Sequence, residues 1–270
     1  MEKRYYYSIA SGSSGNCGLY VSGGTAVLFD LGVSVRRLRQ ALATLELDVP
    51  DLTGVLITHE HMDHVKGLAT FVKKYDVPLF ATRPTADALT RKTPLAADKL
   101  RPFFGGETFA LGSLSVQSFL TPHDAAESVG YVLRSDRHAF GFATDLGFMP
   151  SQVKQKLLGC DTVVLESNHD PVMLQNGPYP WPLKQRVGGA QGHLSNPDCA
   201  VCAAQLARSG TRTLILAHLS EHNNTPLTAY RETRQALDGC GAACEVYIAP
   251  KGSMEEPILL PAEEARVCCL

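Results

Sequence analysis

Histidine and aspartate side chains crowd the segment VLITHEHMDHVKG, which begins at Val55. A β-branched run typical of a strand ends at Thr58 and is followed by four metal-ligand types, His59, His61, Asp63 and His64. Alternate residues of an extended backbone project to one side, so the first two histidines are expected to point the same way, and the other two residues turn the corner into a helix. Burying such a group without metal would leave polar atoms unsatisfied, so the pattern predicts two adjacent metal ions.

Three more ligand-type residues each follow a strand-like run later in the chain: His123, Asp145 and His218. Imidazole and carboxylate ligands suit zinc and also accept manganese or iron. Two divalent ions ~3.5–4 Å apart lower the pKa of a bridging water, provide hydroxide at neutral pH and stabilise charge during phosphoryl or acyl transfer. The residues therefore predict a dinuclear metal-dependent hydrolase with two divalent ions per chain.

These residues, together with VLFDLG, in which Asp30 ends an earlier strand, resemble the metallo-β-lactamase superfamily over nearly the whole chain. The resemblance implies two ligand groups: His59, His61 and His123 for one metal, and Asp63, His64 and His218 for the other. It also implies that Asp145 bridges the metals and that Asp30 orients ligands without binding metal itself. The histidine at position 61 favours hydrolysis, because the flavodiiron branch has a carboxylate there.

The stretches TVVLESNHD and GHLSNPD are similar to the phosphodiesterase branch that includes the tRNA 3′-processing ribonucleases. By matching position, Glu166 would orient His193, which would donate a proton to the leaving oxygen or stabilise charge on the phosphoryl group. A proton donor of this kind contributes roughly 10²–10⁴-fold. Asp63 is then the candidate base. Ser195 is suited to cap a helix whose free N–H groups would favour an anion beside His193.

Four stretches taken together resemble a single family, the YycJ/WalJ type of small metallo-β-lactamase-fold protein: SIASGSSGNC, ESNHD, NGPYPWPLKQRVGG and GHLSN. The resemblance implies a 5′-to-3′ exonuclease that uses a metal-bridging hydroxide and acts on DNA rather than RNA. Between Asp145 and His218 there is no room for the extra domain of related RNA-processing enzymes, which agrees with this family.

Substrate contacts are expected from two segments. The run SGSSGNC lacks the Gly-Lys-Ser/Thr ending of a nucleotide-binding loop, and we predict that Ser13, Ser14 and Asn16 border the metal site and help to seat a phosphate. A plain hairpin is the alternative. Further contacts are expected from Asn168, Lys184, Arg186 and Ser195. The aromatic rings of Tyr179 and Trp181 either stack on a terminal base or pack as part of a folded loop.

The length of 270 residues, with 44% hydrophobic and 19% charged residues, predicts one globular domain spanning residues 1–270. No apolar run approaches the ~18 residues of a membrane helix, and the first residues lack a signal-peptide pattern, so a cytoplasmic protein without membrane contact is expected. The net charge of −2 argues against general attraction to nucleic acid but leaves room for a local basic surface. The sequence carries no signal of oligomeric state.

The fold that must position these residues is predicted from periodicity. Apolar runs predict strands at 5–9, 18–21, 26–29, 54–58, 113–120, 129–133, 138–143, 162–166, 213–218 and 245–249. Helical patterns occur at 35–45, 64–75, 197–207 and 227–237. This order favours the α/β class with a four-layer αβ/βα sandwich, the metallo-β-lactamase fold. Residues 174–192 are expected to be an irregular loop, and His138 to be exposed. Cys199 and Cys202 are expected to share a buried helix face.

Two other functions are compatible with the same ligands. An acyl hydrolase, either a thioesterase or a lactonase, would use all seven and would not need His193. A non-catalytic binding protein would lack tightly bound divalent metal. The response of DNA cleavage to loss of His193 therefore separates the nuclease from the acyl hydrolase, and the metal content separates both from a binding protein.

Overall fold

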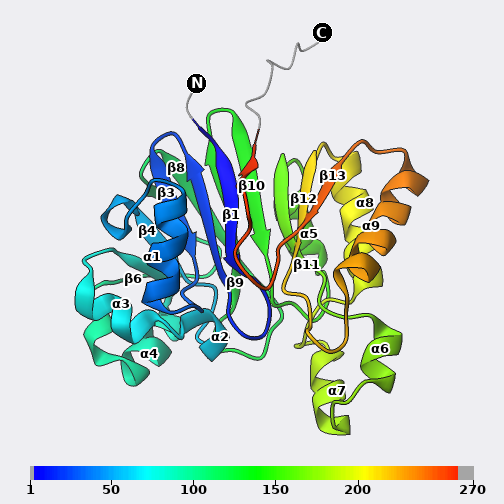
Figure 1. Ribbon diagram of the computed structural model, residues 1–270, viewed down its shortest axis with the longest axis horizontal. Helices are drawn as coiled ribbons and strands as arrows, with labels where there is room; N and C mark the ends of the chain where they lie inside the picture. Colours follow the sequence, from blue (N-terminus) through cyan, green and yellow to red (C-terminus); the bar gives the residue numbers. More distant parts are fainter. Residues whose placement is uncertain (1–2, 261–270) are drawn as a thin grey trace.

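Two β-sheets of seven strands each form the centre of the computed structural model, which describes residues 3–260 (Figure 1). The first sheet has the order β14-β1-β2-β3-β4-β5-β6. Its strands are β1 (Tyr5–Ala10), β2 (Cys17–Ser22), β3 (Thr25–Phe29), β4 (Gly54–Leu56), β5 (Leu79–Thr82), β6 (Leu100–Phe103) and β14 (Ile258–Leu259). Strand β14 brings the end of the described chain back beside β1.

The second sheet has the order β13-β12-β11-β10-β9-β8-β7. Its strands are β7 (Thr108–Leu111), β8 (Leu114–Leu120), β9 (Val129–Ser135), β10 (His138–Ala143), β11 (Thr162–Glu166), β12 (Thr213–Ala217) and β13 (Glu245–Ile248). Both sheets begin with antiparallel hairpins and continue as parallel strands, from β3 to β6 in one and from β10 to β13 in the other. Each half of the chain therefore presents the carboxyl ends of several parallel strands on one side.

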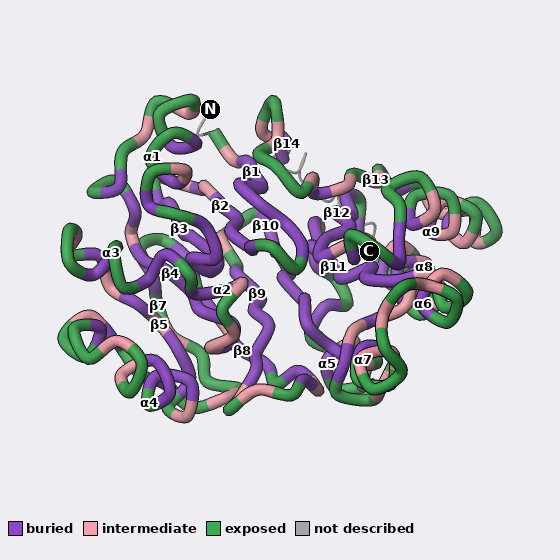
Figure 2. Tube along the Cα trace, turned by 60° about the horizontal axis from the view of Figure 1, so that its bottom comes forward, coloured by how far each residue is buried: buried purple, intermediate pink, exposed green. Residues whose placement is uncertain are grey.

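Helices cover the outer face of each sheet (Figures 1 and 2). The first half has α1 (Val35–Thr44), α2 (Met62–Val65), α3 (Leu68–Lys74), α4 (Arg83–Lys92) and the short 3₁₀ turns η1 (Val49–Asp51) and η2 (Pro94–Ala96). The second half has α5 (Ser151–Leu157), α6 (Pro171–Asn176), α7 (Trp181–Val187), α8 (Asn196–Arg208) and α9 (Pro226–Cys240). Among residues 3–260, every helix is too short or too polar to cross a lipid bilayer.

Aromatic side chains from both sheets fill the space between them. The Phe29 and Phe142 rings stack with centroids 4.3 Å apart, and those of Tyr20 and Phe140 stack at 4.4 Å. Separate apolar clusters join each sheet to its own helices. Cys199 and Cys202 belong to the cluster beneath α8, which confirms their predicted burial. The layers are therefore helix, sheet, sheet and helix, and the predicted four-layer αβ/βα sandwich is confirmed.

Several predictions of local structure were wrong. The helix expected over 64–75 is two helices, α2 and α3, because the chain turns at Gly67, whose N–H donates to Leu31 O at 2.8 Å. A Cβ at this glycine would lie 2.1 Å from Val33 O, so no other residue fits. Residues 174–192 are not an irregular loop, because α7 occupies their centre with proline in its first turn, where the missing N–H costs nothing.

His138 is buried instead of exposed, with 5% of its surface accessible. It is the first residue of β10 and faces the inner side of the sheet, where its ring stacks on Tyr20 at 6.5 Å between centroids. Neither ring nitrogen has a hydrogen-bond partner within the described residues. The position next to a hairpin turn did not indicate which face of the strand this side chain occupies.

Candidate metal centre

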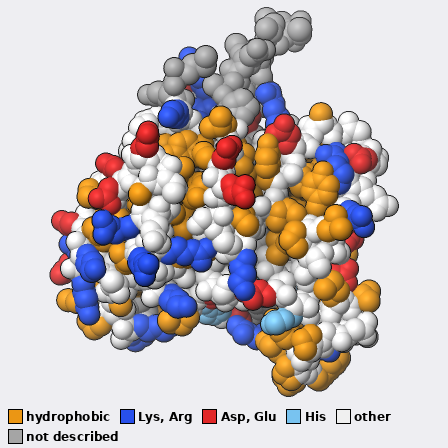
Figure 3. Space-filling view, viewed as in Figure 1, with side chains coloured by type: hydrophobic (Ala, Val, Ile, Leu, Met, Phe, Trp, Pro, Cys, Tyr) orange, Lys and Arg blue, Asp and Glu red, His pale blue; other side chains and the backbone are white. Residues whose placement is uncertain are grey.

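The predicted ligands and the residues expected to orient them lie where parallel strands of both sheets end. Asp30 directly follows β3, His218 directly follows β12, and Glu166 is the last residue of β11. Ligand sites of α/β proteins form at the carboxyl ends of strands, where loops and helix starts converge. This edge lies at the bottom of Figure 1, near α2 and α7. Figure 3 shows histidine side chains reaching the surface along the same edge.

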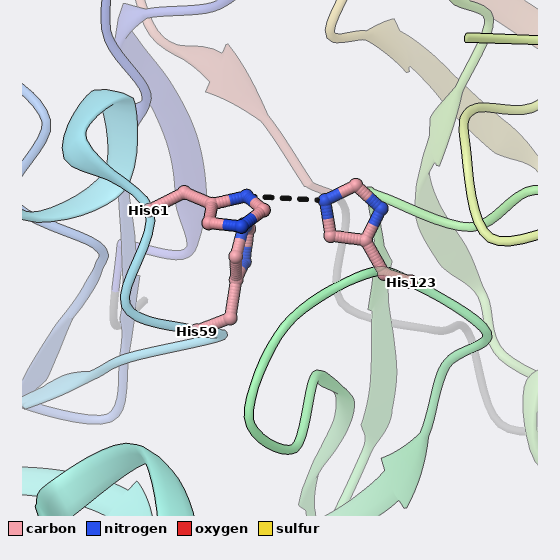
Figure 4. A group of neighbouring side chains, drawn as sticks. All are labelled: His59, His61 and His123. Carbon is pink, nitrogen blue, oxygen red and sulfur yellow. Dashed lines mark hydrogen bonds between the residues drawn. The ribbon is translucent and has the colours of Figure 1, made fainter. Parts of the chain in front are cut away.

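The structure brings all seven predicted ligands together. Groups whose ligand atoms lie within 4.8 Å of one another are His59, His61 and His123; Asp63, His64 and His218; His59, His64 and Asp145; and Asp145, Glu166, His193 and His218. In Figure 4 the rings of His59 and His61 approach His123 from the opposite side of the site, and His61 Nδ1 is 3.3 Å from His123 Nε2. Each half of the chain supplies part of the cluster.

Each of four imidazole rings has its Nδ1 atom bound to another part of the protein. Nδ1 of His59 lies 3.0 Å from Thr58 Oγ1, and Nδ1 of His64 lies 2.8 Å from Asp30 Oδ2. The other two contacts are His123 with Gly192 O at 3.0 Å and His218 with Glu166 Oε1 at 2.7 Å. Holding Nδ1 in this way fixes the ring orientation and leaves Nε2 to face the cluster.

His61 uses the opposite nitrogen, since its Nε2 lies 3.2 Å from Asp124 O and its Nδ1 faces His123. Three atoms at the centre of the cluster, His59 Nε2, His218 Nε2 and Asp145 Oδ2, are buried and have no hydrogen-bond partner among the described residues. Buried polar atoms without partners are rare and costly, and three of them within one cluster of ligand-type side chains fit bound cations. The mixture of imidazole and carboxylate donors fits divalent metal ions.

Asp30 anchors this arrangement from behind. Its buried carboxylate accepts hydrogen bonds from Thr58 N at 2.8 Å, from the Thr58 hydroxyl and from His64. Burial raises the pKa of Asp30, although His64 and Thr58 act in the opposite direction. Thr58 was not identified from the sequence, since a strand threonine carries no signal that its hydroxyl will join Asp30 to two histidines.

Backbone strain is concentrated here. Asp30, Asp145 and His218 have φ angles of 60°, 59° and 57°, and among the described non-glycine residues only Glu46 shares this left-handed conformation. Such a conformation costs about 1–3 kcal/mol per residue and persists where the surroundings enforce it. Strained residues cluster at functional sites, which is consistent with the position of these three at strand ends.

Charges within the cluster shift the ionisation of its members. Burial alone lowers the pKa of His218, but Asp145, Asp63 and Glu166 outweigh it and raise that pKa to about 10. Burial raises the pKa of Asp63, but His218 and His64 outweigh it and lower that pKa strongly. Asp145, Asp63 and Glu166 together therefore favour positive charge in the centre.

Glu166 and His193 form a pair beside the ligands. Glu166 is fully buried, and its Oε1 lies 2.9 Å from His193 Nδ1, while its Oε2 accepts hydrogen bonds from Leu146 N and Leu194 N at 3.0 Å. Burial raises the pKa of Glu166, but His193 and His218 outweigh that effect and lower it. His193 lines a cavity of about 210 Å³ over the ligands.

The opening loop contacts the ligand group formed by Asp63, His64 and His218. Asn16 is buried, and its Nδ2 donates to Asp63 Oδ2 at 3.2 Å and lies 3.0 Å from His64 Nε2. The Ser11 hydroxyl, which the sequence did not identify, accepts a hydrogen bond from His218 N at 2.7 Å. Ser13 is exposed and lines the cavity, whereas Ser14 is exposed and lies beside Glu221. Ser13 and Asn16 thus border the site, and Asn16 touches ligands directly.

The other predicted substrate contacts divide into two groups. Asn168 and Ser195 have local partners, since Asn168 Nδ2 donates to His218 O at 2.7 Å and Ser195 caps α8. Arg186 lines the metal cavity and forms two bonds with Asp124, at 2.6 and 3.1 Å. Lys184 instead lines a neighbouring cavity of about 370 Å³.

The two aromatic residues of this region line different cavities. Tyr179 lines the metal cavity and meets His222 edge to face at 5.7 Å. Trp181 lines the neighbouring cavity with Lys184 and is 66% exposed, so its ring does not cover the core. The packed-loop alternative is therefore wrong for Trp181, and stacking on a terminal base stays a prediction.

Comparison with known proteins places this site in context. Residues 25–219 match the family model described as a beta-lactamase superfamily domain. The chain is 36% identical over 251 residues to Exodeoxyribonuclease YycJ of Bacillus anthracis, covering 90% of this chain and 94% of that protein. It is 32% identical over 249 residues to Exodeoxyribonuclease WalJ of Streptococcus pneumoniae, covering 90% and 93%. The metallo-beta-lactamase fold protein YhfI of Bacillus subtilis superposes with a TM-score of 0.67 at 16% identity, covering 93% of this chain and 98% of that one.

Proposed function

The chain belongs to the metallo-β-lactamase superfamily and, within it, to the family of the YycJ and WalJ exodeoxyribonucleases, and from this premise we propose that it is a metal-dependent 5′-to-3′ exodeoxyribonuclease. The observation that carries the proposal is the Glu166–His193 pair, held 2.9 Å apart beside the ligand cluster. Such a pair provides proton transfer to a leaving group, which a phosphodiester requires. Residues 1–270 act in this proposal as one domain.

We propose that His59, His61, His123, Asp63, His64, His218 and Asp145 hold two divalent ions, with zinc expected and manganese or iron as alternatives. Such ions supply a water molecule of lowered pKa and neutralise charge on the phosphoryl group. Asp30 and Glu166 hold His64 and His218 in the required tautomer through their Nδ1 atoms.

His193 is the proposed proton donor to the leaving oxygen. Its Nδ1 is bound to Glu166, so its Nε2 is the atom left to carry a proton toward the substrate. The ionised Glu166 stabilises the imidazolium and fixes the plane of the ring, because its second oxygen is held by Leu146 N and Leu194 N. Asp63 is the candidate base, because its carboxylate lines the same cavity as His193.

Two further residues are placed to orient a nucleotide. Arg186 lines the cavity while its guanidinium is bound by Asp124, which sets its direction. Ser13 lies on the same cavity with an exposed side chain. A guanidinium and a hydroxyl are common phosphate partners. DNA is the expected substrate in preference to RNA, because the similar YycJ and WalJ proteins are exodeoxyribonucleases.

The proposal is tested by digesting single- and double-stranded DNA and RNA, labelled at the 5′ or the 3′ end, with zinc or manganese added. Immediate loss of a 5′ label as mononucleotide, with a 3′-labelled strand shortened gradually, is the expected result. Release from the 3′ end would overturn the polarity. Hydrolysis of a thioester or lactone by a protein that degrades no polymer would establish an acyl hydrolase instead.

A further inference from the structure

A second and larger hollow lies on the outer side of the first sheet, between α1 and α3. It has a volume of about 730 Å³ and is open to solvent. Four of its ten lining residues are cationic, Arg36, Arg39, Lys66 and Lys74, and none is acidic. Uncharged hydrogen-bonding side chains lie between them, from Ser34, Gln40 and Thr70.

The cations of this groove are largely without partners. Within the described residues, Arg36, Lys66 and Lys74 form no ion pair, and all three are exposed. Arg39 approaches Asp48 at 3.9 Å, but both side chains are more than 60% exposed, so this pair contributes little. Arg37, in contrast, turns away and binds Ile9 O at 2.6 Å. The free charges of α1 are therefore those that face the groove.

The short helix α2 runs from the metal centre to the groove. Asp63 points into the metal cavity, and Lys66, three residues later at the end of α2, lines the groove. Three residues of helix advance about 4.5 Å, so Asp63 and Lys66 lie roughly one helical turn apart. Figure 3 shows Lys and Arg side chains over α1 and α3, continuing toward the histidines at the lower edge.

We propose that this groove binds the sugar–phosphate backbone of the DNA strand whose terminal nucleotide occupies the metal cavity. The inference rests on the proposed nuclease function and adds the path of the strand. Single-strand binders combine a positively charged groove that follows the backbone with hydrogen bonds that do not read sequence, and this groove offers both. The metal cavity, about 210 Å³, is too small to hold more than the end of a strand.

The overall charge of the chain indicates that DNA binds only where cations gather locally. With a net charge of −2, the protein as a whole repels a polyanion weakly, so a strand is attracted only where cations gather. Through Lys66 the groove reaches within about one helical turn of Asp63, in the site that needs the strand. Its contacts would hold a long substrate between rounds of cleavage and would contribute nothing to a mononucleotide ester.

The test uses the variant R36E/R39E/K74E in the metal-loaded protein and leaves Lys66 unchanged, because it is close to Asp63. The control is K156E/R208E/R231E, which has the same net charge and alters exposed residues on helices of the second sheet. Binding of a phosphorothioate 30-mer is measured by fluorescence anisotropy over a range of salt concentrations. Kinetics are measured on the ordinary 30-mer and on p-nitrophenyl thymidine 5′-phosphate.

The groove variant is expected to bind the 30-mer about 10-fold or more weakly, and the slope of log affinity against log salt should fall by about 2, since each lost phosphate contact removes ~0.7. Its KM for the 30-mer should rise while kcat/KM for the thymidine ester stays unchanged. An equal loss of affinity for the 30-mer in the control, or unchanged affinity in the groove variant, would overturn the proposal that the groove binds DNA. A wild-type protein that binds DNA but degrades no strand with any metal would instead overturn the nuclease.

Discussion

Oε1 of Glu166 lies 2.9 Å from Nδ1 of His193, and the same oxygen lies 2.7 Å from Nδ1 of His218. A single carboxylate therefore holds the proposed proton donor and a proposed metal ligand in fixed positions relative to each other. The other oxygen is bound by two backbone N–H groups, so the carboxylate itself cannot rotate freely. The consequences for catalysis can be measured through His193.

Replacing His193 with alanine is expected to lower kcat for DNA by roughly 10²–10⁴-fold, the usual contribution of a positioned proton donor. Metal content, measured by elemental analysis, should stay at the wild-type value, because this residue is not a proposed ligand. The loss should be much smaller with p-nitrophenyl thymidine 5′-phosphate, whose leaving group needs no proton. Equal losses on both substrates would contradict the role of His193.

Replacing Asn16 with alanine is expected to weaken metal binding about 10–100-fold, the usual effect of losing a residue that holds a ligand. The physical reason is the hydrogen bond that its amide donates to Asp63 Oδ2, which holds that carboxylate in place. Metal affinity is measured by competition with a chelating dye. The variant S14A is the control, because that side chain is exposed and lies outside the metal cavity. A wild-type metal affinity in N16A would contradict this role and favour the one predicted from the sequence, in which Asn16 helps to seat a phosphate.

Removing metal with a chelator is expected to lower the melting temperature by about 5–10 °C relative to protein with zinc at 100 times Kd, where binding adds about 2.7 kcal/mol. The full set of ligands from both sheets is assembled only in the native state, so the native state binds the metal more tightly than the unfolded chain does. Thermal melts with increasing zinc measure this. The variant D145N should respond much less, and an identical response would show that zinc binds elsewhere.

The pH dependence of stability should include a contribution from His138. Burial lowers its pKa from 6.5 to about 4, with Asp161 acting against this and Arg4 adding to it. The unfolded state therefore binds the proton more tightly, so stability is complete above pH 6.5 and is lost as pH falls toward 4, by up to about 3 kcal/mol. Urea unfolding of wild type and H138Q from pH 4 to 7 should show a shallower slope in the variant. The exposed His222 provides the control, since H222Q should leave the wild-type slope unchanged.

Gly32 should tolerate no side chain. A Cβ there would lie 1.7 Å from Asp63 O and 2.4 Å from Asn16 N, both backbone atoms beside the metal site. We expect G32A to lose at least about 1–3 kcal/mol of folding free energy and to bind metal poorly. Denaturant unfolding measures the first effect. G239A is the matched control, because nothing lies within 4 Å of its Cβ and the position is helical, so stability should be unchanged or higher.

The sequence predicted that the His and Asp side chains would meet, because these residues follow strand-like runs and carry distinctive side chains. Four residues of metal-ligand type occur within six positions from His59 to His64, and such density has no ordinary structural explanation. The outer support of the cluster was not predictable in the same way. Thr58 and Ser11 act through contacts with residues 28 and 207 positions away, and a single hydroxyl has no pattern that marks such a contact.

The fold was predicted at the level of layers, while several elements were missed. Strand β5 is short, with four residues, and β14 has two, so neither gives a readable alternation. Helix α7 is hard to recognise in the sequence because prolines are also typical of loops, although Pro182 lies in the first turn, where proline favours a helix start. The burial of His138 depends on which face of β10 meets the other sheet, which only the assembled sandwich decides.

The division of the ligands between the two sheets has a consequence for the continuity of the polypeptide. A cut in the turn at residues 104–107, between β6 and β7, would leave His59, His61, Asp63 and His64 on one fragment and His123, Asp145 and His218 on the other. Neither fragment would carry all the ligands of the metal site, so a divalent ion would link the two fragments. Reassembly of the two fragments would then become a reaction driven by metal concentration.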